Sequence, residues 1–267
     1  MGKWEVDTSG WLQEHQTSIA EQTDVMEQIL ASCVGSDVVL QREVILRNDA
    51  ARSKPITFSR QDNPTQTKEY EIYLALRDSW DYRRFLYQAG HEFGHVLMEC
   101  YPRKECFKWI SECLCSAISM YIMHRMKRFF PEQKKFYKDY RNSVFTRPKE
   151  ILANHESVLD FYTQNKLDFW LDPEGPNENG VRTRNGVVEL SWLEIIKKNP
   201  SAMKSVIHMD DSSIDLPPSG AYTNCDIMVH EMTTLFFQTW KSNCQGDAEK
   251  VFARDIAASI GYELLEI

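Results

Sequence analysis

The chain has 267 residues, with 39 acidic and 31 basic side chains and a formal net charge of −8. That length can bury a sizeable core, the acidic balance argues against nucleic acid as the main partner, and no stretch approaches the roughly 18 continuous apolar residues of a membrane span. No signal-peptide pattern opens the sequence, and the seven cysteines lack disulfide-like spacing, which favours free thiols. We therefore expect a cytoplasmic protein with neither a membrane nor a nucleic-acid partner.

The first elements in chain order are a helix and a set of strands. Residues 11–34 carry apolar side chains at loosely helical spacing and are predicted to form a helix. Three runs rich in β-prone residues follow, and we interpret them as strands: 38–40 continuing to 44–46, then 56–58, then 70–76. Asp78 or Ser79 is then in position to cap a helix that runs from about Trp80 to Glu99.

This last helix contains the most informative stretch of the chain, His-Glu-Phe-Gly-His at residues 91–95. Positions four apart lie on one face of an α-helix, so His91 and His95 can point both imidazoles at one metal ion. Glu92 falls beside the open coordination position, where a carboxylate can take a proton from a metal-bound water. Neutral imidazoles suit Zn²⁺, which lowers the pKa of its water to about 7. The motif predicts a zinc hydrolase with Glu92 as its general base.

A catalytic zinc usually has three protein ligands, so a third must come from elsewhere in the chain. Met98 and Tyr101 stand where a metzincin would continue with Gly and His, which excludes that class. Pro102 ends the motif helix, and a second, mostly buried helix is predicted over 107–123. We look for the missing ligand on this second helix.

Glu112 is the only carboxylate in the second helix. Burying an unpaired carboxylate is costly, and a metal partner would offset that cost. Small side chains at Cys115, Ser116 and Ser119 share its face and would let the motif helix approach closely. We therefore predict Glu112 as the third ligand. Glu99 and Glu105 remain alternatives, whereas His124 points well away from the same face.

With these residues the chain resembles the gluzincins, in which a His-Glu-x-x-His helix is followed by a second helix that donates Glu. The small core and the run Glu112–Ala117 look most like minimal gluzincins, including the ImmA/IrrE group of bacterial and phage metallopeptidases. The resemblance covers roughly residues 38–128. It implies an α+β fold with a small sheet packed on a metal-binding helix pair, Zn²⁺ as cofactor, and a peptide or protein as substrate.

The resemblance also implies a role for the strand just before the motif helix. In such enzymes this strand forms the upper edge of the cleft, where unpaired backbone groups bind an extended peptide. By this analogy 70–76 is the edge strand. An ordinary internal strand is the alternative interpretation.

The remaining sequence is predicted to form a mostly helical C-terminal extension, 131–267, attached to a metallopeptidase core at 1–130. Its first part is predicted to be helical in two pieces broken near Pro148. Asn185-Gly186 is expected at the turn of a hairpin over 181–190. Two amphipathic helices are predicted near the end of the chain, at about 225–241 and 247–259.

The sequence as a whole predicts a zinc metallopeptidase, expected to be an endopeptidase, in which His91, His95 and Glu112 bind the metal. A Tyr or His is also expected to steady the oxyanion, and the candidates are Tyr121, His124, His208, Tyr222 and His230. The alternative function is a regulatory or interaction protein that retains a zinc site with little or no turnover. Neither the substrate's identity nor the oligomeric state follows from the sequence.

Overall fold

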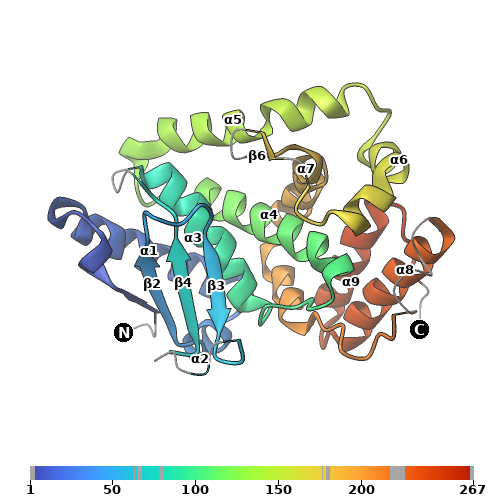
Figure 1. The fold of residues 1–267 in the computed structure, drawn as a ribbon, viewed down its shortest axis with the longest axis horizontal. Coiled ribbons are helices and arrows are strands. Elements are labelled where there is room, and N and C mark those ends of the chain that lie inside the picture. The colour runs from blue at the N-terminus through green and yellow to red at the C-terminus, as the bar shows by residue number, and fades with distance from the viewer. Residues whose placement is uncertain are drawn as a thin grey trace. The chain divides into compact units, whose positions relative to one another are not determined.

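The computed structural model describes most of the chain, namely residues 4–62, 64, 68–77, 81–175, 177–178, 181–216 and 226–264. These residues form many helices, a four-stranded mixed sheet and a small two-stranded sheet (Figure 1). The predicted α+β class is confirmed at this level, and the gluzincin-type core stays a prediction. Within the described residues, no helix is both long enough and apolar enough to cross a membrane.

The chain divides into two compact units. One comprises residues 1–100 and 118–141, and the other comprises residues 101–117 and 142–267. The dividing point falls inside helix α4 (Lys108–Met126), which therefore belongs to both units. The division at residue 130 stays a prediction.

The first unit is built on a four-stranded sheet with the order β1-β2-β4-β3. Its strands are β1 (Trp4–Val6), β2 (Val44–Asn48), β3 (Ile56–Ser59) and β4 (Tyr70–Leu74). Strand β2 pairs in parallel with both β1 and β4, and β3 pairs antiparallel with β4. Val44 and Leu46 on β2 are fully buried and alternate with partly exposed residues, as the two-residue period of a strand requires.

The expectation that 70–76 forms an edge strand is wrong. Strand β4 pairs with β2 on one side and with β3 on the other, so it is internal. The strand at that end of the sheet is instead β3. Strand β3, which precedes β4 in the chain, pairs antiparallel with β4 and so occupies its outer edge. The sequence pattern of 70–76 alone does not reveal this pairing.

Two helices precede the second strand of the sheet. Helix α1 (Gln13–Val34) confirms the helix predicted over 11–34. The strand predicted at 38–40 is wrong, because these residues lie in helix α2 (Ser36–Gln41). Gly35, with a φ of 101°, allows the chain to turn sharply and restart a helix that buries Val38 and Val39. Burial outweighs the β-propensity of the valines.

Helix α3 (Tyr82–Leu97) is the motif helix. Its N-cap is Asp81, whose carboxylate accepts a hydrogen bond from the backbone N–H of Arg84 at 3.3 Å. The cap predicted at Asp78 or Ser79 is therefore wrong, and those two residues lie outside the described part of the chain. The helix packs on β3 and β4, and its Phe93 ring stacks on Trp4 of β1 with centroids 4.0 Å apart.

The second unit is mostly helical, as predicted for the C-terminal part. Its longer helices are the second half of α5 (Lys134–Leu152), α6 (Val158–Leu171), α7 (Thr183–Lys198), α8 (Asp226–Asn243) and α9 (Asp247–Ala258). The last two confirm the predicted pair of helices near the end of the chain. Shorter 3₁₀ helices in the two units are η1 (Thr8–Gly10), η2 (Glu105–Phe107), η3 (Pro131–Gln133) and η4 (Pro200–His208).

Two local predictions in this region are wrong for a shared reason. Helix α5 runs through Pro148 without a break, and Asn185-Gly186 lies inside α7 rather than at a hairpin turn. A Cβ on Gly186 would lie only 2.6 Å from Cγ of Pro148, so the glycine leaves room for the proline ring. A smaller hairpin does form just before α7, between β5 (Asn177–Glu178) and β6 (Val181–Arg182).

Candidate metal centre

Helix α3 places the two motif histidines on one face. The imidazole rings of His91 and His95 lie with their centroids 5.0 Å apart, because four residues make slightly more than one helical turn. His91 is buried and His95 is partly exposed. One turn before His91, the ring of Tyr87 lies 6.3 Å from the His91 ring, centroid to centroid. The paired imidazoles predicted from the motif are therefore present.

Helix α4 approaches the motif helix closely at Gly90. A Cβ at this position would lie 3.1 Å from Cα of Ser119 and 3.3 Å from Cδ1 of Ile122, so a larger residue would force its neighbours to give way. The Ser119 hydroxyl donates a hydrogen bond of 2.8 Å to the backbone carbonyl of Tyr87. These contacts all lie within the first unit. The close approach predicted from the small side chains of the second helix is confirmed at Ser119.

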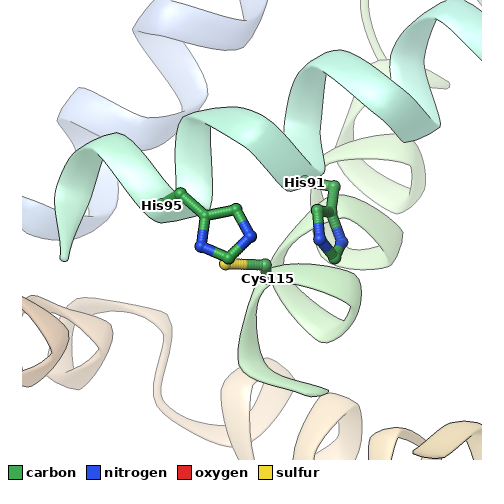
Figure 2. A group of neighbouring side chains, drawn as sticks. All are labelled: His91, His95 and Cys115. Atoms are coloured by element: carbon green, nitrogen blue, oxygen red, sulfur yellow. The ribbon is translucent and has the colours of Figure 1, made fainter. Parts of the chain in front are cut away.

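Cys115 joins the two histidines to form a compact group of possible metal ligands. It lies one turn before Ser119 on the same continuous helix, and its sulfur and one ring nitrogen from each histidine all lie within 4.8 Å of one another. Figure 2 shows both imidazoles on one side of α3, with the Cys115 side chain rising from α4 toward them. Within the described residues, this is the one group of three or more His, Cys, Asp or Glu side chains so arranged.

The chemistry of these donors fits a metal ion. Imidazole nitrogen and thiolate sulfur are both common zinc ligands, and a set of three protein ligands leaves one tetrahedral position open. Cys115 is fully buried, and His91 is only 7% exposed. Convergent donors of which two are buried are typical of a built metal site.

Glu92 lies next to His91 in the chain but is not a member of this group. Its side chain is 4% exposed, and its carboxylate accepts a hydrogen bond of 2.8 Å from the hydroxyl of Thr57. Thr57 belongs to β3, the strand at the end of the sheet. The general base predicted from the motif is therefore held by a residue that sequence reasoning missed, because only strand pairing brings Thr57 to the motif helix.

Glu112, the predicted third ligand, is a partly exposed residue of α4. It lies on the turn before Cys115 but is not a member of the group formed with the two histidines. Its role as a ligand stays a prediction. Of the two alternatives, Glu99 forms an ion pair with Arg42, and Glu105 pairs with Lys108 at 2.6 Å.

The described candidates for oxyanion stabilisation lie on α4, η4 and α8. The four described candidates each have a neighbouring partner: Tyr121 with Arg125, His124 with Lys127, His208 with Glu249, and His230 with Tyr262. Tyr222 lies outside the described residues. The oxyanion-stabilising residue stays unassigned.

Two neighbouring cysteines of α4 have different surroundings. The sulfur of Cys113 donates to the backbone carbonyl of Asn185 at 3.8 Å, and burial raises the pKa of the Cys113 thiol well above its ordinary value. Cys115 instead lies with the histidines. The six cysteines in the described part of the chain are all free thiols, as the sequence predicted.

Comparisons with known proteins add no identification to this geometry. No protein-family profile matches the chain, and neither do the curated proteins or the solved structures.

Proposed function

We propose that this protein is a zinc-dependent metallopeptidase. The observation that carries the proposal is the convergence of His91, His95 and Cys115 beside a buried glutamate that follows the first histidine. Two histidines one turn apart with a glutamate between them are a ligand pair and a base for metal-assisted hydrolysis. A chance pair of surface histidines would need neither a buried carboxylate nor a buried thiol beside it.

The residues divide the work between binding and proton transfer. His91 and His95 would hold the ion, and bound zinc would supply Lewis acidity toward a water molecule and a peptide carbonyl. The Glu92 carboxylate would serve as the proton acceptor from water and as the proton donor to the departing amine. The Thr57 hydroxyl fixes the Glu92 carboxylate in its buried position, which reduces the motion needed for both transfers.

An extended peptide is the substrate class that suits the surroundings of Glu92. Strand β3 stands at the end of the sheet, and such a strand can pair with another extended chain through its outer backbone groups. Thr57 of this strand also bonds to Glu92. A peptide added to β3 would therefore lie close to the proposed base.

Glu92→Gln tests the proposal, because it keeps the shape of the side chain and removes its ability to take a proton. With zinc content matched to the wild type, we expect hydrolysis of a mixed peptide library to fall by about 10²–10⁴-fold. Glu99→Gln is the matched control, since this residue follows the same helix and pairs with Arg42, and its rate should stay near that of the wild type.

Two outcomes would reject the peptidase. One is a zinc-loaded wild type that cuts no peptide in the library, and the other is equal cutting by the wild type and Glu92→Gln. Either result would favour the alternative of a regulatory or interaction protein that retains its metal with little turnover.

A further inference from the structure

We infer that Cys115 is a ligand of the metal, in the position that the sequence assigned to Glu112. The inference deepens the proposed function, since it rests on the same zinc site and changes the donor set to two imidazoles and a thiolate. It concerns binding and is testable without peptidase activity.

The separation of the donor atoms favours this assignment. Typical bond lengths of about 2.0–2.1 Å for Zn–N and 2.3 Å for Zn–S place tetrahedral donors roughly 3.3–3.6 Å from one another. The nitrogens of His91 and His95 and the sulfur of Cys115 already lie within 4.8 Å of one another. A contraction of about 1 Å, well within the reach of side-chain rotation, would bring all three onto one ion.

The position of Cys115 is fixed by the helix that carries it. Ser119, one turn further along α4, bonds to the carbonyl of Tyr87 and packs against Gly90 on the motif helix. Since an α-helix is continuous and stiff over one turn, these contacts also hold Cys115 beside the histidines. Glu112 precedes Cys115 by three residues. At a rise of 1.5 Å per residue it therefore lies roughly 4.5 Å farther than Cys115 from Ser119 along the helix axis.

The chemistry of a buried thiol supports the same conclusion. A metal-bound cysteine is deprotonated outright, because the charge of the ion stabilises the thiolate. Cys115 is fully buried next to two imidazole donors suited to zinc. Cys113 shows the contrasting case, since its sulfur donates a hydrogen bond to the backbone carbonyl of Asn185.

The exchange of ligands preserves the charge of the site. A thiolate and a carboxylate each carry one negative charge, so a set with Cys115 has the same formal charge as the set with Glu112. Sulfur is the softer donor and favours zinc over harder ions such as Mg²⁺. The predicted difference is therefore in metal preference and spectroscopy.

The experiment replaces zinc with Co²⁺ in the full-length protein and records its near-ultraviolet and visible absorption. A cobalt–thiolate bond gives an intense charge-transfer band that nitrogen and oxygen ligands do not give. We expect this band in the wild type, in Cys113→Ala and in Glu112→Ala, and we expect it to be absent from Cys115→Ala. Cys113→Ala is the matched control because it makes the same change two residues away on the same buried helix.

Zinc affinity, measured by competition with a chelator, gives a second readout. Because loss of an outer partner of a ligand already weakens binding by about 10–100-fold, Cys115→Ala should weaken it by about 100-fold or more. Glu112→Ala should change it by less than about tenfold. The inference is overturned if the cobalt-loaded wild type lacks the band, if Cys115→Ala keeps it, or if Glu112→Ala is the variant that loses zinc.

The wild type alone keeps the inference falsifiable if Cys115→Ala fails to fold. X-ray absorption at the zinc edge should then show one sulfur at about 2.3 Å, whereas a shell of only nitrogen and oxygen near 2.0–2.1 Å would refute it. Failure of the proposed function has a different signature. If the protein shows the thiolate band but has no Glu92-dependent peptidase activity, Cys115 remains a metal ligand and the proposed peptidase function is rejected.

Discussion

Removing the hydroxyl of Thr57 should destabilise the protein only while Glu92 is present to accept its hydrogen bond. The two oxygens lie 2.8 Å apart, and Glu92 is 4% exposed. A hydrogen bond to a charged group contributes about 1.5–3 kcal/mol. Because Thr57 is itself partly exposed, we expect the lower part of that range, about 1.5–2 kcal/mol, for Thr57→Val, which keeps the shape of the side chain.

A double-mutant cycle isolates this bond. Urea unfolding of the metal-free protein would compare the wild type, Thr57→Val, Glu92→Met and the double variant. In the Glu92→Met background the carboxylate is gone and only a weak contact of 3.4 Å to the backbone carbonyl of residue 92 remains. Thr57→Val should then change the free energy of unfolding by less than about 0.5 kcal/mol.

Thr57→Ser, which keeps the hydroxyl, is the control and should lose much less stability than Thr57→Val. The coupling energy is the difference between the two costs of Thr57→Val, about 1–2 kcal/mol. The same cost in both backgrounds would show that the hydroxyl does not bind the carboxylate. It would also refute the argument that β3 positions the proposed base.

Further predictions concern the helix contact, a loop held by the buried Asp211, the metal and a thiol. Gly90→Ala should destabilise the protein by up to about 2 kcal/mol in urea unfolding, because crowding against Ser119 costs about 1–3 kcal/mol and the gain in helix propensity returns about 1 kcal/mol. A net gain in stability would contradict the close helix contact. Asp211→Ala should lower the free energy of unfolding by at least about 2 kcal/mol in the same assay, because the backbone N–H groups of Arg103 and Lys104 lose their acceptor. Asp211→Asn keeps one acceptor oxygen and should therefore cost less. Zinc at 1,000 times its dissociation constant should stabilise the wild type by about 4 kcal/mol in thermal unfolding, and His91→Ala should abolish that gain; equal gains in both proteins would place the ion elsewhere. The raised pKa of Cys113 leaves little thiolate near neutral pH, so mass spectrometry should find it alkylated only after unfolding, and rapid labelling of the native protein would contradict its burial.

The sequence was most informative where function follows from spacing along one helix. The four-residue separation of His91 and His95 was enough to predict that both rings share a face, and Glu92 could be set apart from them by one helical step. The partners supplied by other elements were less accessible. Thr57 reaches Glu92 through strand pairing, and no local pattern distinguishes it from any other threonine in a β-prone run.

The helix face that carries Cys115 was predictable, but the side chain that reaches the histidines was not. Glu112 and Cys115 are three residues apart and share that face, so periodicity favours neither. The errors elsewhere have a similar origin. Pro148 and Gly186 each read locally as breaks in regular structure, and only their mutual contact across two helices explains why both are helical.

The packing of helix α4 bears on how modular this protein is. Trp109, in the first half of α4, lies against the rings of Tyr162, Phe169 and Trp192, with centroids 4.9–6.0 Å away, and it is 1% exposed. A fragment ending near residue 130 would keep the histidines but lose all three of these aromatic partners, each pair worth about 0.5–1.5 kcal/mol beyond the area it buries. The helical C-terminal part thus supplies aromatic packing that the first half of α4 would otherwise lack.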